Sequence, residues 1–555
     1  MTRRGFAALF GVVAIRLFWL QIVDGSDLAS AAEANRTNVA TLHAKRGTIY
    51  DRNGNVLAMS IDCSTIYCNP QNVHDPSGLA TILADILGGD YNDYLTDVTA
   101  DTTFVYIKHQ VDADVVKKLK GKLSERDIEG IYYLDDTKRV YPYNGTGGQI
   151  LGAVGTDGQG LTGLELQYED VLTGVDGEMI METGLGGTPI AGGTYEVHEA
   201  VDGADIILGI DVNIQEKAEA ALSDAVKTYK AASGSVLVMN PKTGEIHCAC
   251  STPFADVSDL STVDSAGLTL KLVSMSYEPG SVFKILTTST GIQAGLFTSD
   301  STYAIPETIQ VGDDTVRDDD SRDYTMDMTI REMLRRSSNV AMAYLVQNVI
   351  GAKTFSEGVD AFGIGHKTGV DYPGEATGIV KSYEDYDGAT AGSMAFGQAV
   401  AVPMIQIARA FSAVANGGTL VTPHFLTTKG GEEVEWSTGG SPISAGTAAQ
   451  VTDMMRTVMQ AGTGQNGQVA GYDIAGKTGT GEQASSEGGY AEYNYTASLC
   501  GFANASDPDV LVYVGLNGVA HLAKDSAAPL FATIMSETVT DLNIPPATST
   551  ITEGA

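Results

Sequence analysis

The second half of the chain alternates between two kinds of hydrophobic pattern. Apolar residues recur at helical spacing between 212 and 230 and predict an amphipathic helix there. These residues are Ile214, Ala218, Ala221, Leu222, Ala225 and Val226. Apolar runs typical of strands lie within 235–250 and 496–516, whereas helical patterns follow Ser281 and cover 330–349. The pattern therefore predicts an α/β (α+β) body.

The first part of the chain has a different pattern of residues. Residues from about 40 to 200 mix short strand-like runs, helical stretches and many glycines, with a hairpin signal at Asn53-Gly54. We expect an elongated mixed domain over 24–203 and a second domain over 204–540. The proline- and threonine-rich end predicts a disordered tail over 541–555.

A mostly apolar stretch near the N-terminus predicts a membrane anchor. Residues 5–23 follow Arg3 and Arg4 and approach the lower length of a bilayer span. Arg16 interrupts the stretch, so a short amphipathic helix is an alternative. No small-residue cleavage pattern follows, and we expect an uncleaved transmembrane signal anchor over 1–23. The predicted location is the cell membrane, single-pass, with the catalytic body extracytoplasmic.

Composition narrows the possible partners. The 555 residues are 43% hydrophobic and carry a formal net charge of −35, which argues against nucleic acid as a partner. Five cysteines are too sparse for a disulfide scaffold, and pairing of Cys63 with Cys68 is left open. The eight histidines show no metal-ligand spacing, so we predict no metal and no cofactor.

Three short motifs in a fixed order carry the candidate chemistry. Ser281-Val282-Phe283-Lys284 is an S-x-x-K motif, Ser337-Ser338-Asn339 an S-x-N motif, and Lys477-Thr478-Gly479-Thr480 begins with K-T-G. Each motif is weak alone. Together they provide what an acyl-transferring serine site needs when it has no histidine base.

The nucleophile and its base follow from the first motif. Pro279-Gly280 ends any preceding helix, so Ser281 should lie near a helix N-terminus, where negative charge developing on oxygen is favoured. Lys284 should share that helix face. It can accept the serine proton only when neutral, and burial beside a second cation, Lys477, would lower its pKa.

The remaining motif residues suit substrate handling. Ser337 could bridge the two lysines and relay a proton to the leaving amine, while the Asn339 amide holds a peptide substrate. The backbone N–H of Thr480 is the expected second oxyanion donor, beside Gly479. Thr478 and Thr480 could hydrogen-bond a carboxylate that Lys477 attracts.

The tripeptide K-T-G occurs three times, so we have to decide which copy is the third motif. Lys242-Thr243-Gly244 lies between two strand-like runs and reads as a hairpin turn. Lys367-Thr368-Gly369 lies in a glycine-rich loop. The copy at Lys477 follows Ile474-Ala475-Gly476 and is compatible with an edge strand, so we expect it to be the site.

These motifs together resemble those of a class B high-molecular-weight penicillin-binding protein of the division or sporulation type. Further similarities are Arg46 to Gly54 and Gly163-Leu164-Glu165, which resemble that family's pedestal motifs, and Gly397-Gln398 with Asn416-Gly417-Gly418. The resemblance implies a penicillin-recognising serine transpeptidase fold, with a central antiparallel sheet flanked by helices. It also implies a non-catalytic pedestal and a membrane anchor.

The resemblance also implies an activity and partners. It implies a peptidoglycan D,D-transpeptidase that cross-links stem peptides through a Ser281 acyl-enzyme, releases terminal D-alanine, and is blocked covalently by β-lactams. The implied partners are stem peptides, β-lactam antibiotics, the cell membrane and a glycan-polymerising membrane protein. Two alternatives stay open, namely a D,D-carboxypeptidase or β-lactamase hydrolase and a non-catalytic β-lactam sensor or scaffold.

Overall fold

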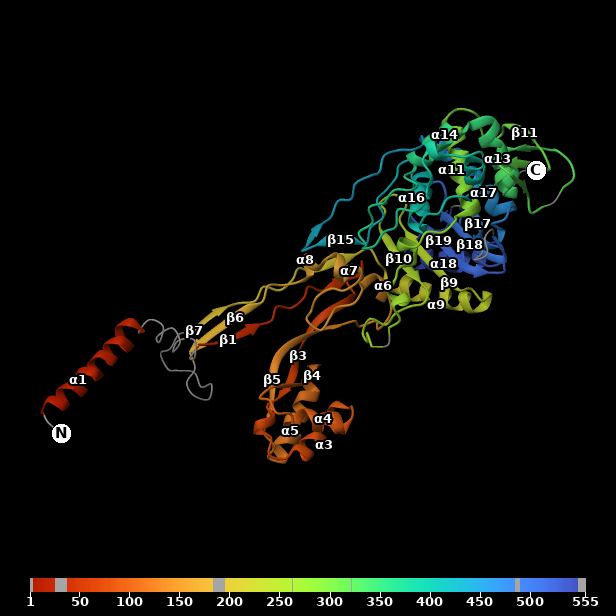
Figure 1. Ribbon diagram of the computed structural model, residues 1–555. Coiled ribbons are helices and arrows are strands. Elements are labelled where there is room, and N and C mark those ends of the chain that lie inside the picture. Colours follow the sequence, from red (N-terminus) through yellow and green to blue (C-terminus); the bar gives the residue numbers. More distant parts are fainter. Residues whose placement is uncertain are drawn as a thin grey trace. The chain divides into compact units, whose positions relative to one another are not determined.

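The computed structural model describes residues 3–24, 37–182, 195–261, 263–320, 322–484 and 490–547 (Figure 1). They fold into two compact units that alternate along the sequence. The first unit draws on 1–47, 60–138 and 173–204, and the second on 48–59, 139–172 and 205–555. Two segments of the predicted N-terminal domain, 48–59 and 139–172, thus belong to the second unit, and no single cut in the sequence separates the two units.

A five-stranded antiparallel sheet forms the centre of the second unit. Its strand order is β10-β9-β19-β18-β17, which places β17 at an edge, as the third motif requires. The strands are β9 (Ser233–Met239), β10 (Ile246–Ser251), β17 (Ile474–Ala484), β18 (Tyr490–Ala503) and β19 (Leu511–Val519). β9 is buried along its whole length, which its continuous apolar run predicts. The antiparallel sheet expected from the resemblance is confirmed.

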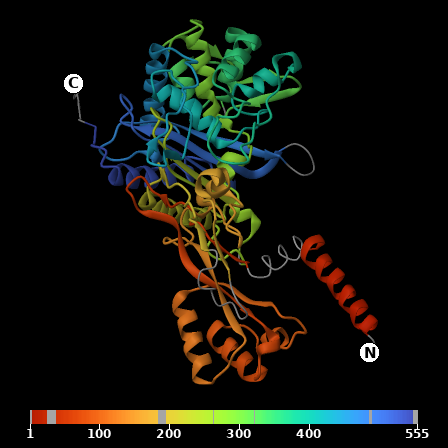
Figure 2. The same cartoon turned by 90° about the vertical axis from the view of Figure 1, so that its left-hand side faces the viewer.

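Helices cover both faces of this sheet, and the alternation of side chains along β9 shows how. Val236 and Val238 pack into one apolar core with helices α9 and α18, whereas Leu237 and Met239 belong to the core on the opposite face. In Figure 2, helices coloured green to teal lie on one side of the blue strands. The main covering helices are α9 (Val212–Tyr229), α18 (Ala527–Asp541), α11 (Lys284–Gln293), α16 (Met404–Ala415) and α17 (Ala445–Ala461).

Smaller elements complete the second unit. Two-stranded sheets pair β11 (Thr302–Ile305) with β14 (Met326–Thr329), and β12 (Thr308–Val311) with β13 (Asp314–Arg317). A further sheet joins β16 (Glu432–Glu433), β15 (Leu426–Lys429), β8 (Ile206–Leu208), β2 (Ile49–Tyr50) and the start of β3 (Val56–Cys68). The short helices are α6 (Gly148–Leu151), α7 (Gly163–Gln167), α8 (Glu169–Leu172), α10 (Lys271–Ser274), α12 (Ile330–Arg336), α13 (Asn339–Leu345), α14 (Ala352–Ala361) and α15 (Thr390–Met394).

The first unit has its own small core. The later part of β3 pairs with β4 (Val105–Val111) and β5 (Ile131–Val140). Three helices contribute apolar side chains to the core beside these strands, and they are α3 (Pro76–Leu87), α4 (Tyr91–Val98) and α5 (Ala113–Glu125). A second antiparallel sheet has the order β1-β6-β7, from β1 (Thr37–Leu42), β6 (Gly177–Glu182) and β7 (Tyr195–His198). The expected mixture of strands and helices is confirmed.

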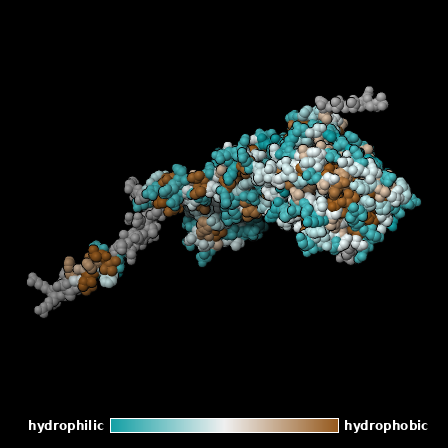
Figure 3. Space-filling view, turned by 90° about the horizontal axis from the view of Figure 1, so that it is seen from above, coloured by the Kyte–Doolittle hydropathy of each residue, from teal (hydrophilic) through white to brown (hydrophobic). Residues whose placement is uncertain are grey.

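The N-terminal segment is helical. α1 (Arg3–Phe18) continues into a π-helical turn, Trp19–Val23. Large apolar side chains on it, including Phe10 and Ile22, are exposed, and they colour this helix brown in Figure 3. Within the part of the chain that the structure describes, no helix has both the length and the apolar character needed to cross a membrane.

Two other expectations can be compared with the structure. The disordered tail predicted from the sequence begins at residue 541, which is too early. α18 includes Asp541, and the residues that follow it are hydrogen-bonded to the body of the second unit. Tyr472 Oη donates to the Ile544 carbonyl at 2.9 Å, and the Ala547 N–H donates to the Gly471 carbonyl at 3.0 Å. All five cysteines are buried free thiols, and this holds for Cys63 and Cys68.

Candidate active site

Ser281 lies at the start of a helical segment, as predicted. Gly280–Phe283 form a 3₁₀ turn that runs directly into α11. Gly280 has a φ of +57°, and a Cβ there would come within 2.6 Å of the Thr480 carbonyl oxygen. Only glycine tolerates both constraints, so this residue lets the nucleophile turn approach strand β17 closely.

Lys284 is completely buried one turn after Ser281. Its Nζ donates to the Ser337 carbonyl at 2.5 Å and to Asn339 Oδ1 at 2.6 Å, and Ser337 Oγ lies 3.3 Å away. The first two motifs, more than fifty residues apart in sequence, are therefore joined through one amine.

The S-x-N motif is a tight turn between two helices rather than part of one continuous helix. α12 ends as Ser337 adopts the left-handed conformation with a φ of +60°. Ser338 then caps α13, because its Oγ accepts a hydrogen bond from the Ala341 N–H at 3.0 Å. The turn directs Ser337 and Asn339 towards the same lysine.

Lys477 approaches the same hydroxyl from the sheet. It is fully buried on β17, opposite Cys500 of β18. Its Nζ donates to Ser337 Oγ at 2.9 Å and to the Thr478 carbonyl at 2.9 Å. Ser337 thus lies between the two lysines, with its Oγ in contact with both amines.

Burial lowers the pKa of both lysines, so one of them can be neutral while the other keeps its charge. Burial lowers the pKa of Lys284 to about 7, although the carboxylates of Asp318 and Asp319 act in the opposite direction. Burial, and then the neighbouring Lys284 charge, hold the pKa of Lys477 well below its ordinary value. Burial, rather than a second cation, is therefore the main cause of the lowered pKa of Lys284.

The outer edge of β17 lies directly against the nucleophile segment. A Cβ on Gly479 would come within 2.9 Å of the Pro279 carbonyl oxygen, and one on Gly481 within 2.4 Å of the Glu278 carbonyl oxygen. Two glycines flanking Thr480 thus permit the close approach. This contact places the Thr480 backbone beside the Ser281 turn, where a second oxyanion donor is needed.

The threonine hydroxyls of the third motif already have neighbours. Thr478 Oγ1 lies 2.5 Å from Thr463 Oγ1, and Thr480 Oγ1 accepts a hydrogen bond from the Ala523 N–H at 3.4 Å. Because Thr480 Oγ1 accepts this hydrogen bond, the Thr480 hydroxyl can still donate its proton to an anion. Sequence reasoning missed Thr463, since no motif marks it.

A loop that sequence reasoning assigned no role also borders the site. The Gly280 N–H donates to the Gly397 carbonyl at 3.0 Å, and the Ala399 N–H donates to Glu278 Oε1 at 2.9 Å. Gly397 has a φ of +85° and lies against Gly280, within the Gly397-Gln398 pair noted from the sequence. The loop therefore supports the turn that presents Ser281.

The other two K-T-G copies make contacts with carboxylates away from Ser337. Lys242 lies in the turn between β9 and β10 and pairs with Asp507 at 2.5 Å and Asp509 at 2.9 Å. Thr368 donates its N–H and its hydroxyl to Glu375 Oε1, both at 2.6 Å. Of the three copies, the structure brings Lys477 into hydrogen-bonding contact with Ser337.

Comparison with known proteins agrees with this geometry. Residues 234–536, more than half of the chain, match the penicillin binding protein transpeptidase domain, and residues 41–208 match the penicillin-binding protein dimerisation domain. The chain belongs to the class B high-molecular-weight penicillin-binding proteins.

Its relatives span nearly the whole of this penicillin-binding protein. Stage V sporulation protein D of Bacillus subtilis (strain 168) is 31% identical over 98% of this chain and 86% of its own length. Peptidoglycan D,D-transpeptidase FtsI of Escherichia coli (strain K12) is 26% identical over 98% of this chain and 92% of its own. A crystal structure from Atopobium parvulum DSM 20469, described provisionally as a peptidoglycan glycosyltransferase, is 46% identical, with a TM-score of 0.73, over 92% of this chain and 100% of that one. The matched domain here is a transpeptidase domain, so that description is not transferred.

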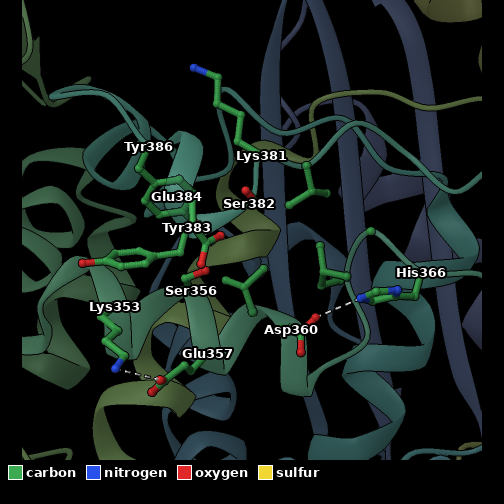
Figure 4. A pocket seen from close by; sticks show the side chains of 14 residues that line it. Lys353, Ser356, Glu357, Asp360, His366, Lys381, Ser382, Tyr383, Glu384 and Tyr386 are labelled. Atoms are coloured by element: carbon green, nitrogen blue, oxygen red, sulfur yellow. Dashed lines mark hydrogen bonds and ion pairs between the residues drawn. The ribbon is translucent and has the colours of Figure 1, made fainter.

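This penicillin-binding protein also has a cavity of about 490 Å³ elsewhere in its second unit (Figure 4). Residues of α14 and of the segment 380–386 line it, including Tyr383 and Tyr386. His366 Nε2 and Asp360 Oδ1 are hydrogen-bonded at 2.8 Å on its wall. No residue of the three motifs lines this cavity, so it is separate from the serine site.

Proposed function

We propose that this chain is a peptidoglycan D,D-transpeptidase in which Ser281 is the nucleophile. The observation that carries the proposal is the chain of contacts from the buried Lys284 through Ser337 to the buried Lys477, beginning one helical turn from Ser281. It supplies a base, a proton relay and a cation without histidine.

In the acylation step, the neutral amine of Lys284 accepts the Ser281 hydroxyl proton as the oxygen attacks the carbonyl carbon of the D-alanyl-D-alanine bond. The backbone N–H groups of Ser281 and Thr480 stabilise the oxyanion. Ser337 passes a proton to the leaving nitrogen as the C–N bond breaks, and the Lys284 ammonium gives its proton to Ser337. Terminal D-alanine leaves, and the donor peptide remains as an ester on Ser281.

In the second step, an amine from a neighbouring stem peptide attacks the ester carbonyl. The amine loses a proton to the lysine network, the C–O bond to Ser281 breaks, and the serine oxygen recovers its proton. The products are a new amide cross-link and free enzyme.

Four motif residues would hold the donor peptide. Asn339 uses its Oδ1 atom to accept from Lys284, which leaves its NH₂ group for a substrate carbonyl. The substrate carboxylate would lie near Lys477, with donors from Thr478 and Thr480 along the edge of β17. Gly479 allows the strand to pass close to the nucleophile turn.

The test of this proposal is intact-mass analysis of the full-length chain mixed with benzylpenicillin and followed over hours. A transpeptidase is expected to form an adduct of one penicillin per chain that persists, because water enters the acylated site poorly. An adduct that clears rapidly would favour the hydrolase alternative. Absence of any adduct would contradict the serine mechanism.

The rate of this acylation should depend on pH in a way set by Lys284. With a pKa of about 7, the amine is protonated below neutral pH and cannot accept the serine proton. The second-order rate of acylation is therefore expected to fall about tenfold per pH unit below pH 7, and to be nearly constant between about pH 8 and pH 9. A midpoint near pH 10, the pKa of an ordinary lysine, would contradict the lowered pKa of Lys284.

The domain limits and location are part of the proposal. We assign residues 1–23 to the anchor, the rest of the first unit to the pedestal, and the second unit to the transpeptidase domain, whose body reaches residue 547. The exposed apolar side chains of α1 and the two arginines at its start support attachment to the cell membrane, with the catalytic body outside. A glycan-polymerising membrane protein would supply the strands that this enzyme cross-links.

A further inference from the structure

Asp318 is a buried carboxylate behind the turn that carries Ser337 and Asn339. It follows β13 directly, and its side chain is only 4% exposed. The guanidinium of Arg322, 6% exposed, lies 3.6 Å from Asp318 Oδ2. A carboxylate buried this deeply requires strong partners. Its position beside the Lys284–Ser337–Lys477 contacts suggests a role in the site.

Two hydrogen bonds attach this carboxylate to the S-x-N turn. Asp318 Oδ2 accepts from Ser338 Oγ at 2.7 Å, and Oδ1 accepts from the Val340 N–H at 3.0 Å. Ser338 and Val340 flank Asn339, so both atoms that Asp318 holds are adjacent to a residue that contacts Lys284. The carboxylate thus fixes the first turn of α13.

Arg322 fixes the carboxylate from the other side. Its guanidinium donates to the carbonyls of Ile305 at 2.9 Å, Tyr324 at 3.0 Å and Pro306 at 2.7 Å. These three backbone acceptors hold the arginine in place. Asp318 is therefore a fixed charge at a fixed position.

We propose that Asp318 is a positioning residue of the acylation step, which orients the Ser337–Asn339 turn around Lys284 and places one fixed negative charge behind that turn. This inference rests on the proposed function. Its physical basis is that a fixed anion near a buried amine favours the ammonium form, whereas burial favours the neutral form.

The charged groups that face Lys284 come from two directions. Lys477 approaches from β17, while Asp318 and Asp319 approach from the segment after β13. Ser337 and Asn339 are neutral. Asp318 raises the pKa of Lys284 against the effect of burial. A base that is near its pKa at neutral pH can both accept and return a proton.

The test is the pH profile of acylation by a fluorescent penicillin for the full-length Asp318→Asn variant. The amide keeps the shape and can still accept from the Val340 N–H, but the charge is gone. The plateau rate is expected to fall about tenfold, because the turn is held less firmly. The midpoint of the acid limb is expected to move to lower pH by about one pH unit, because the charge that favoured the ammonium form is absent.

Two variants separate charge from orientation. Asp320→Asn makes the same change two residues away, where the carboxylate pairs with Arg336 instead, and should leave both rate and midpoint unchanged. Ser338→Ala removes a hydrogen bond to Asp318 but no charge, and should lower the plateau rate without moving the midpoint. Thermal melting of each variant sets the temperature at which all are folded.

The titration of Lys284 gives a readout that does not need activity. The ¹³Cε chemical shift of this lysine, followed against pH by NMR, should show the same downward movement in Asp318→Asn. An unchanged midpoint in Asp318→Asn, or an equal movement in Asp320→Asn, would overturn the proposal. Failure of the wild-type chain to react with penicillin would instead contradict the proposed function, and the NMR titration would still decide the role of Asp318.

Discussion

Replacing Ser281 with alanine is expected to abolish covalent reaction with benzylpenicillin. The oxygen that would form the ester is removed. Lys284 and Lys477 remain in place, but Lys284 has no serine hydroxyl from which to accept a proton. Intact-mass analysis of Ser281→Ala should show no adduct under conditions in which the wild-type chain is fully modified. Because Ser281 is small and only half-buried, the free energy of unfolding should change by no more than about 0.5 kcal/mol.

Ser289→Ala provides a matched control for that result. Ser289 lies on α11, the helix that continues from the Ser281 turn, and is completely buried. Removing its hydroxyl changes the same atom type on the same helical segment, and the variant should form the adduct at the wild-type rate. An adduct on Ser281→Ala, at any stoichiometry above background, would place the nucleophile elsewhere.

Replacing Lys477 with methionine is expected to reduce kcat/KM for acylation about 100-fold. The loss combines a charge-assisted contact to the substrate carboxylate with one partner of the Ser337 hydroxyl, and each is worth about 1.5 kcal/mol or more. Methionine has nearly the same length, so β17 should keep its register. Stability should fall by at most about 2 kcal/mol, since the unmet acceptors are offset by removal of a buried amine.

The other K-T-G copies supply controls for this prediction. Lys242→Met and Lys367→Met change the same residue in the same tripeptide, but neither side chain contacts the Ser281–Ser337 network in the described residues. Both variants should keep wild-type kcat/KM with a fluorescent penicillin or a D-alanyl-D-alanine peptide. A loss in either one comparable to that of Lys477→Met would mean that the third motif was chosen wrongly.

Local sequence signals predicted much of the site. Pro279-Gly280 indicated the start of a helix, and the structure shows Ser281 in its first turn. Small residues around Lys477 indicated an edge strand, and β17 lies at the edge of the sheet. These signals work because helix starts and edge strands depend mostly on neighbouring residues.

Contacts between distant segments could not be predicted in the same way. Nothing in the sequence links Asp318 to Ser338, or Thr463 to Thr478, since each contact depends on how separate segments pack. The two units also could not be predicted as continuous stretches of sequence, for a similar reason. β3 is a thirteen-residue strand that begins in the second unit and ends in the first, and no composition change marks the crossing.

The end of the chain shows the limit of a composition argument. Pro545 and Pro546 suggested disorder, yet the carbonyl of Ile544 accepts from Tyr472 and holds the segment against the body. Proline prevents helix continuation but does not prevent an extended segment from packing. The structure therefore extends the body to residue 547.

The most direct measurement of the central claim is a product analysis. The full-length chain would be incubated in detergent with glycan-linked stem peptides that end in D-alanyl-D-alanine and carry a free acceptor amine, and the products identified by mass spectrometry. The account predicts peptides joined by a new amide bond, with one D-alanine released per cross-link, and no such product from Ser281→Ala. Products that have lost D-alanine by hydrolysis alone, or unchanged substrate beside a stable penicillin adduct, would contradict it.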